Sequence, residues 1–203
     1  MEQKLKSAIT RRKILSSADY EFADKGLSAA RVDEISARAG VNKQLIYAHF
    51  KSKELLYKAV LEDVYARLGI CEQSLAETKF EGAQTIKKII LEYFNFLAEN
   101  PSFVRLMLWE NLNYAKNSDA LHTTLFFGIR KLLREAVDDG KIRADLDVDQ
   151  IVLSINMFCF STFSNIYTVS HLLGKDLSQK AELDKRAAHI TDIITEYIFK
   201  GAE

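Results

Sequence analysis

This 203-residue sequence has few residues that interrupt secondary structure or form disulfides, with one proline, eight glycines and two cysteines. So little proline and glycine argues against disorder and against a fold of short strands and tight turns. Cys71 and Cys159 lie far apart with no cysteine beside them, which excludes a disulfide scaffold and indicates a reduced, cytoplasmic protein. The first residues are charged rather than apolar, so no secretory signal is expected.

Charged residues are missing from one long stretch, Ile151–Leu173. That length would cross a lipid bilayer. However, a helix alone in lipid has no partners for polar side chains. The polar residues within the stretch are Ser154, Asn156, Ser161, Thr162, Ser164, Asn165, Thr168, Ser170 and His171. We therefore predict one helix buried on most sides within a soluble protein, and no membrane partner.

Elsewhere, local signals divide the N-terminal sequence into four helices. The first is predicted over Ala8–Lys25 and ends at Gly26, and a short second helix ends at Gly40. Asn42 is a good N-cap for a third helix, and Ser52 for a long fourth one. Two short helices joined by a glycine-containing turn are typical of a helix-turn-helix.

Beyond this region the helices lengthen, because apolar residues recur at spacings of three and four over longer stretches. The expected ranges are Gly82–Glu99, a helix restarting at Asn100 and Pro101, about Ala120–Asp139, Ile151–Leu173 preceded by Asp147 as a cap, and a last helix from Leu183 to Ile198. The sequence therefore predicts an all-α protein.

The net charge of zero conceals an uneven distribution. Residues 1–58 carry 12 Lys and Arg against 7 Asp and Glu, whereas residues 59–203 carry 16 against 21. A basic N-terminal part beside an acidic remainder favours a local polyanion-binding surface.

The predicted third helix has two kinds of side chain. Ile46 and Phe50 lie one turn apart and should face a core. Lys43 and Gln44 at its start are suited to base edges and phosphates. Spacing alone leaves two interpretations open: this side is either a DNA-binding surface or the solvated face of a helical hairpin.

A family resemblance bears on that choice. The stretches "ILSSADYEFADKG" and "VDEISARAGVNKQLIYAHFKSKELL", within residues 9–60, resemble the N-terminal domain of the TetR family of bacterial transcriptional regulators. The stretch "DDGKIRADLDVDQI" resembles a loop before the eighth helix of that family. The resemblance implies a three-helix helix-turn-helix DNA-binding domain over residues 1–52 and a helical ligand-binding and dimerisation domain over residues 53–203.

By position, the resemblance implies roles for individual residues. Lys43 and Gln44 are expected to face bases, while Tyr47, His49 and Lys53 are expected to meet the DNA backbone. Leu45 stands where a small hydroxyl residue is frequent and is expected to touch a thymine methyl group. Arg31 departs from the usual Thr, so it can reach phosphate but cannot cap the second helix in the same way. Arg11 and Arg12 are either further backbone contacts or solvated charges.

The resemblance also implies a homodimer on a palindromic operator and control by an unidentified small-molecule effector, with the chain acting as a repressor. The helices Ile151–Leu173 and Leu183–Ile198 are candidates for the dimer interface, or for intrachain core. The candidate effector-binding residues are Phe94, Phe103, Met107, Trp109, Glu110, Asn113, His122, Phe126, Asn156 and Phe158.

Two rival functions lack a DNA partner. A helical-bundle enzyme with a di-iron site needs paired Glu-x-x-His motifs, and this sequence has none. It also has no glycine-rich phosphate loop, nucleophile elbow or zinc-ligand spacing, so no catalytic residue, metal or cofactor is predicted. A helical adaptor that binds protein through the hairpin is the other alternative.

Overall fold

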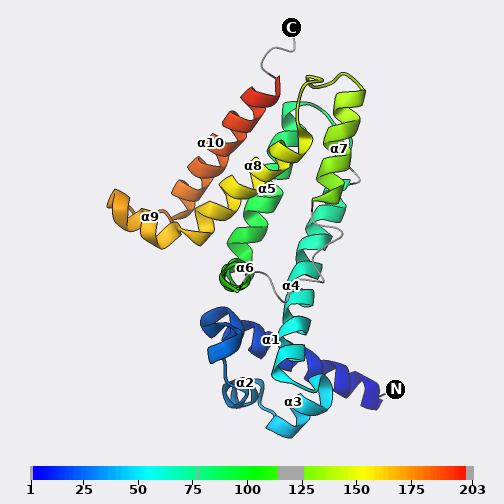
Figure 1. Cartoon of the computed structure of the whole chain (residues 1–203), viewed down its shortest axis with the longest axis vertical. Coiled ribbons are helices and arrows are strands. Elements are labelled where there is room, and N and C mark those ends of the chain that lie inside the picture. Colours follow the sequence, from blue (N-terminus) through cyan, green and yellow to red (C-terminus); the bar gives the residue numbers. More distant parts are fainter. Residues whose placement is uncertain (1, 77, 114–125, 200–203) are drawn as a thin grey trace. The chain divides into compact units, whose positions relative to one another are not determined.

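The computed structural model describes residues 2–76, 78–113 and 126–199, which form helices joined by turns and loops (Figure 1). The all-α prediction is confirmed. In order, the described helices are α1 (Glu2–Ala29), α2 (Val32–Ala39), α3 (Lys43–Phe50), α4 (Lys53–Ala76), α5 (Ala83–Glu99), α6 (Pro101–Leu112), α7 (Phe127–Asp138), α8 (Val148–Ser164), α9 (Ile166–Leu173) and α10 (Lys180–Phe199).

The chain divides into two compact units. The N-terminal unit comprises residues 1–67 and 102–120, and the C-terminal unit comprises residues 68–101 and 121–203. The N-terminal unit therefore holds α1–α3 together with the first part of α4 and nearly all of α6. The boundary between these compact units falls inside α4, and the domain boundary after residue 52 that the family resemblance implies stays a prediction.

The core of the N-terminal unit is built on α1. Its buried side includes Ile14, Ala18 and Phe22, and the Phe22 ring meets the edge of the Tyr57 ring at 5.0 Å between centroids. α1 begins at Glu2 rather than at Ala8, so the predicted start was wrong. The apolar spacing on which that prediction rested begins only where α1 starts to pack.

Gly26 breaks α1 near its end, as the sequence predicts. Its φ of 68° and ψ of 175° lie in a region that essentially only glycine occupies. A Cβ atom at this position would come within 2.8 Å of the Trp109 ring of α6. Trp109 also donates a hydrogen bond from Nε1 to the Ala23 carbonyl at 3.3 Å. Backbone conformation and close packing therefore both require glycine here.

Capping residues determine where α2, α3 and α4 begin or end, and three of the predicted signals are confirmed. Gly40 ends α2 in the left-handed conformation. The Asn42 side chain accepts from the Leu45 N–H at 2.8 Å, at the start of α3. Ser52 Oγ accepts from the Leu55 N–H at 3.1 Å, at the start of α4.

In the C-terminal unit, α8 and α10 pack against α5, and α7 packs against α8 (Figure 1). The core positions include Ile89 of α5, Ile155 of α8 and Ile190 of α10, each at most 1% exposed. Asp147 caps α8 by accepting from the Asp149 and Gln150 N–H groups, as predicted.

Cys159 on α8 is fully buried, and burial raises the pKa of its thiol to about 12. The side chain of Cys71 lies outside the described residues, and so does the beginning of the helix predicted from about Ala120.

The stretch Ile151–Leu173 is not one helix, and this prediction was wrong. α8 ends at Ser164, and α9 continues at an angle of 72°. The break coincides with side chains that bond back to helix carbonyls, since Thr162 Oγ1 donates to Phe158 O at 2.8 Å and Asn165 Nδ2 to Ser161 O at 3.2 Å. No single described helix is long and apolar enough to cross a membrane, and α8 and α9 meet that test only as a bent pair.

Candidate nucleic-acid interface

α3 exposes one side and buries the other. Ile46 and Phe50 are 1% and 5% exposed and anchor the helix to the core of the N-terminal unit. The exposed side of α3 carries Lys43, Gln44, Leu45, Tyr47 and Ala48. The Asn42 cap fixes the start of the helix, so these side chains project from a defined backbone. A short rigid helix with this exposed side can enter the major groove of DNA.

Lys43 is held at the edge of this surface by α2. Its Nζ lies 3.0 Å from Asp33 Oδ1, and both side chains are about half exposed or more. The hydrogen bond with Asp33 raises the pKa of Lys43. The ammonium group is therefore cationic at neutral pH and stands at the junction of α2 and α3.

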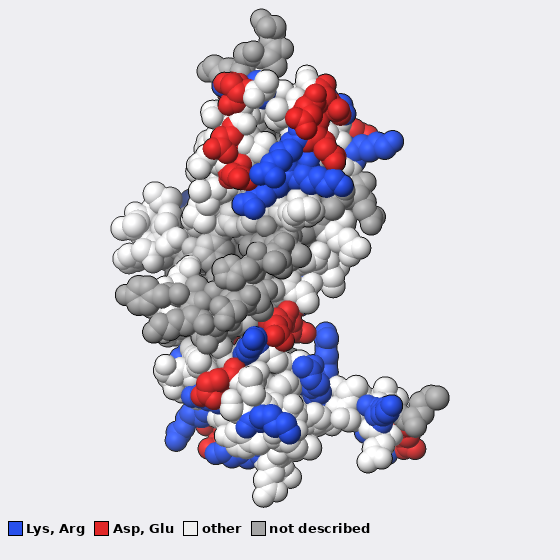
Figure 2. All heavy atoms as spheres, turned by 45° about the vertical axis from the view of Figure 1, so that its right-hand side comes forward, with Lys and Arg blue, Asp and Glu red and all other residues white. Residues whose placement is uncertain are grey.

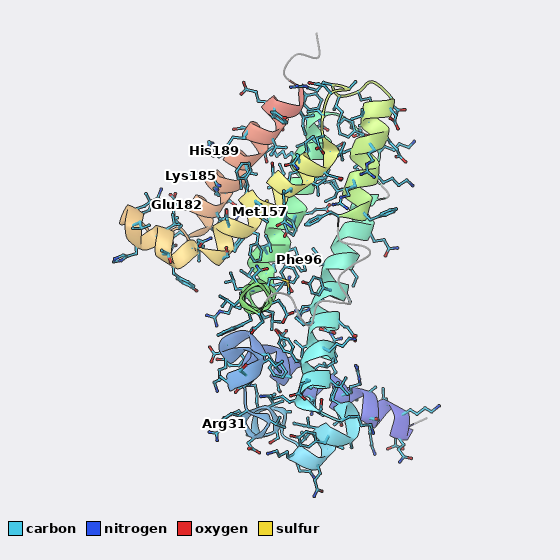
Figure 3. All side chains as sticks on the ribbon, in the orientation of Figure 1. Arg31, Phe96, Met157, Glu182, Lys185 and His189 are labelled. Atoms are coloured by element: carbon cyan, nitrogen blue, oxygen red, sulfur yellow. The ribbon has the colours of Figure 1, made fainter. Side chains whose placement is uncertain are left out.

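Arg31 occupies the N-cap of α2 without capping it, as its departure from the usual Thr predicts. Its side chain makes no cap hydrogen bond and is exposed (Figure 3). Instead, Glu21 Oε1 accepts from the Arg31 backbone N–H at 3.1 Å and from Lys25 Nζ at 2.9 Å. The start of α2 is therefore fixed from α1, and the guanidinium is left on the surface.

Glu21 is a residue that sequence reasoning missed. It is 3% exposed, one of the few buried charged residues among those described. Burial acts to raise the pKa of Glu21, but the hydrogen bonds from Lys25 and the Arg31 N–H outweigh it and lower that pKa. The available signal was its position, because Glu21 lies on the same side of α1 as Ala18 and Phe22.

Lys53, expected at the DNA backbone, has contacts within the protein. Its Nζ donates to the carbonyls of Ser28 and Ala30 at 3.4 and 3.3 Å. These carbonyls end α1 and begin the link to α2. Lys53 therefore joins the start of α4 to that link, and its charge stays at the partly exposed edge of the unit.

Tyr47 and His49 complete the predicted DNA-binding set. Tyr47 is 38% exposed on the outer side of α3, and His49 is partly exposed beside the Phe50 ring. Arg11 of α1 reaches the same end of α3, where its guanidinium lies 5.1 Å from the centroid of the Phe50 ring. All seven residues predicted to bind DNA thus belong to the N-terminal unit.

The predicted effector-binding residues are divided between the two units. Phe103, Met107, Trp109, Glu110 and Asn113 lie in the N-terminal unit, on α6 or just after it. There, Tyr57 OH donates to Glu110 Oε1 at 2.8 Å, and burial together with this hydrogen bond raises the pKa of Tyr57. α6 thus supplies packing and hydrogen-bonding partners to α1 and α4.

The other predicted effector-binding residues lie in the C-terminal unit, except His122, which is outside the described residues. Phe94 meets Phe163, and Phe126 meets Tyr93, both in edge-to-face contacts. Asn156 and Phe158 are partly buried on α8. The same unit holds a cavity of about 370 Å³ between α8, α9 and α10. Its lining is Ser161, Thr162, Val169, Leu173, Leu177, Glu182, Leu183 and Arg186.

Comparison with known families covers both parts of the chain. Residues 14–60 match the model described as bacterial regulatory proteins, tetR family. Residues 83–194, more than half of the chain, match the model of a tetracyclin repressor-like C-terminal domain. The chain belongs to the TetR family. It is a DNA-binding transcriptional regulator and not an enzyme.

Proteins that align with this chain over 90% or more of their own length are consistent with this assignment. The chain is 28% identical over 190 residues to the HTH-type transcriptional repressor NicS of Pseudomonas putida, an alignment that covers 91% of this chain and 90% of NicS. Among solved structures, the TetR family regulator PfmR from Thermus thermophilus is 20% identical with a TM-score of 0.71, covering 93% of this chain and 96% of PfmR. FadR from Bacillus subtilis, solved in complex with stearoyl-CoA, is 22% identical with a TM-score of 0.67, covering 92% and 98%. Both structures share the fold.

Proposed function

We propose that this TetR-family regulator is a repressor that binds a palindromic DNA operator as a homodimer and leaves it when a small molecule binds. The observation that carries the proposal is the exposed side of α3, with Lys43 and Gln44 at its first turn. Lysine and glutamine side chains form bidentate or paired hydrogen bonds with base edges in the major groove. The sign of regulation rests on NicS, which is named a repressor.

Phosphate contacts would hold α3 in register on the duplex. Tyr47 and His49 can donate to phosphate oxygens, and Arg31 and Lys53 carry positive charge at the edges of α2 and α4. The pairing of Lys43 with Asp33 is compatible with this role, because both side chains are well exposed and the pair is weak in water. Leu45, 37% exposed, is available to a thymine methyl group.

The homodimer is supported by a second exposed surface, which we call the apolar face. It consists of Leu153 and Met157 of α8, Tyr167, Leu172 and Leu173 of α9, and Ile193 and Tyr197 of α10, each between 41% and 78% exposed. These residues lie on three helices of which α9 and α10 both contact α8, and large exposed apolar surfaces mark association sites in soluble proteins. A twofold dimer would bury this face against its copy and place two α3 helices on successive turns of DNA.

The effector is proposed to act on the helical domain, residues 53–203. The ten predicted effector-binding residues remain the starting set, and the relative FadR was solved with stearoyl-CoA. Five of them lie on or beside α6, which packs against α1 and α4 in the N-terminal unit. A ligand that alters α6 would therefore favour a state of the dimer in which α3 no longer fits successive grooves.

Selection from random DNA tests the proposed function. The full-length protein is incubated with a pool of random duplexes at 150 mM salt, and bound fragments are recovered and sequenced over several rounds. The proposal expects one palindromic consensus whose half-sites are separated by about one helical turn. Recovery of unrelated sequences in proportion to the pool would contradict it, and would favour a helical adaptor without specific DNA binding.

Effector control needs a separate experiment on the selected operator. Fluorescence anisotropy follows the protein–operator complex while a panel of metabolites, including stearoyl-CoA, is added. At least one compound is expected to release the operator and to raise the melting temperature of the free protein. If binding of a compound raises the melting temperature and never changes operator affinity, the proposed coupling is wrong.

A further inference from the structure

The first part of α1 is a basic helix that lies outside the region shared with the family model. That model begins at residue 14, whereas α1 begins at Glu2. The side chains of residues 2–9 are exposed, and the first buried ones are Ile14 and Leu15. Figure 2 shows this segment projecting from the lower right of the molecule, with blue side chains on it. We call residues 2–13 the basic arm.

The charge of the basic arm is strongly one-sided. It carries Lys4, Lys6, Arg11, Arg12 and Lys13 against the single acid Glu2. Among these five cations, only Lys6 has an acidic residue of the arm one turn away, at Glu2, so the arm keeps a net charge of +4. A polyanion is the partner that this composition fits, and DNA is already the partner of the neighbouring α3.

Helix geometry distinguishes two sides of the basic arm. Lys4 and Arg11 are seven residues apart, so they lie within about 20° of each other around the helix. Arg11 lies against Phe50 at the end of α3. Lys4 therefore lies on the side of α1 that faces α3, and α1 carries this side beyond the end of α3.

Two of the three other cations of the arm have acidic neighbours within the chain. Lys6 pairs with Glu2 at 2.7 Å, about 200° around the helix from Lys4. Arg12 lies 3.9 Å from Asp63 of α4. Lys4 and Arg11 thus form a short basic stripe on the α3 side, while Lys6 and Arg12 have acidic neighbours within the chain.

We propose that the basic arm contacts the phosphates of DNA flanking the half-site read by α3, through Lys4 and Arg11. Lys4 lies about 10 Å farther along the helix than Arg11, a length over which one DNA strand carries about three phosphates. The contact lengthens the footprint of each subunit without reading sequence. It rests on the proposed operator binding and extends it to a second element of the N-terminal unit.

The test compares Lys4→Ala with Lys6→Ala in the full-length protein. Both variants remove one exposed lysine from the same arm, but only Lys4 lies on the α3 side. Anisotropy titrations from 50 to 300 mM salt are run on two duplexes, one trimmed to the selected palindrome and one with eight added base pairs on each side. Lys4→Arg is the conservative variant, and circular dichroism monitors folding.

For a dimer, Lys4→Ala removes two phosphate contacts, so the slope of log K against log salt is expected to become less steep by about two. The wild-type protein and Lys6→Ala should bind the flanked duplex more tightly than the trimmed one, and Lys4→Ala should lose most of that preference. Lys4→Arg should restore it.

Three results would overturn the proposal. If the wild-type protein binds the palindrome equally with and without flanks, the arm does not touch DNA, and operator binding itself stands. If Lys4→Ala and Lys6→Ala have equal salt slopes, Lys4 does not contact phosphate and the arm proposal fails, while operator binding itself stands. If the wild-type protein selects no palindrome at all, the proposed function and the arm contact both fail.

Discussion

In the N-terminal unit, the exposed side of α3 carries Lys43, Gln44 and Tyr47, whereas in the C-terminal unit the exposed sides of α8 and α9 carry Leu153, Met157 and other apolar residues. Both are exposed helix surfaces of one chain, but their chemistry predicts that binding at the two surfaces depends differently on salt concentration. Contacts between charges and phosphates weaken as salt rises, while burial of apolar area does not. One chain therefore has a surface suited to a polyanion and another suited to an apolar partner, which we propose to be its own copy.

The largest effect is expected at the apolar face, from Met157→Glu. A carboxylate placed in an apolar interface loses several kcal/mol of solvation, more than a moderate dimer can offset. The variant should sediment as a monomer and lose at least 100-fold in operator affinity, because each half-site alone binds weakly. Leu112→Glu makes the same change in charge at an exposed leucine of α6 and should remain dimeric. A Met157→Glu protein that stays dimeric would show that the interface lies elsewhere.

The next effect is expected within the N-terminal unit, from Gly26→Ala. The backbone conformation alone costs about 1–3 kcal/mol for a residue other than glycine, and the added Cβ also displaces Trp109. Trp109 is the only tryptophan in the chain, so its fluorescence reports on this unit. The fluorescence transition should move to lower temperature while the dimer persists in sedimentation.

Gly40→Ala is the control for Gly26→Ala within the same unit. Gly40 also has a positive φ, of 66°, in the left-handed conformation, but a Cβ atom there meets nothing within 4 Å. Its cost should be about 1–2 kcal/mol, from the left-handed backbone alone. Equal losses for the two variants would mean that the contact with Trp109 adds nothing.

A smaller effect is expected from Lys53→Ala. If Lys53 meets phosphate, the salt slope of a dimer falls by about two on every duplex, operator or not. Loss of its bonds to Ser28 and Ala30 should also cost about 0.5–1.5 kcal/mol of stability. A loss of stability with an unchanged salt slope would leave Lys53 with the structural role only.

The smallest effect is expected from Glu21→Gln, and it depends on pH. The pKa of Glu21 is lowered in the folded protein, so the carboxylate stabilises the fold above its ordinary value of 4.5, and this contribution is lost as pH falls through the lowered value. Glutamine keeps an oxygen for the Arg31 N–H, so at pH 7 the loss should stay near 1 kcal/mol. The difference in melting temperature between the two proteins should shrink below pH 4, and a constant difference would exclude a charge effect.

Local signals account for the parts of the fold that the sequence predicted. Gly40, Asn42 and Ser52 each act within four residues, so their capping roles are visible without a structure. The roles assigned to Lys43, Gln44 and their neighbours at DNA stay predictions, since they need a partner.

Long-range packing accounts for what the sequence did not predict. The carboxylate of Glu21 accepts from a backbone N–H ten residues away, at the N-cap of the next helix. The contacts of Trp109 and Glu110, which stay predicted effector-binding residues, were not predicted either, because their hydrogen-bond partners Ala23 and Tyr57 lie more than fifty residues earlier in the chain. The bend after Ser164 also escaped prediction, because serine, threonine and asparagine side chains can face solvent or bond back to helix carbonyls.

The most direct test of the central claim, that the exposed side of α3 reads DNA sequence, is the discrimination ratio of Gln44→Ala. This ratio is the affinity for the selected operator divided by the affinity for a scrambled duplex of the same length and composition, at one salt concentration. Losing a base contact costs about 1–3 kcal/mol, so the ratio is expected to fall by about 5- to 150-fold while binding to scrambled DNA stays within twofold. An equal loss on both duplexes would contradict the account, because Gln44 would then contact only the DNA backbone or support the fold.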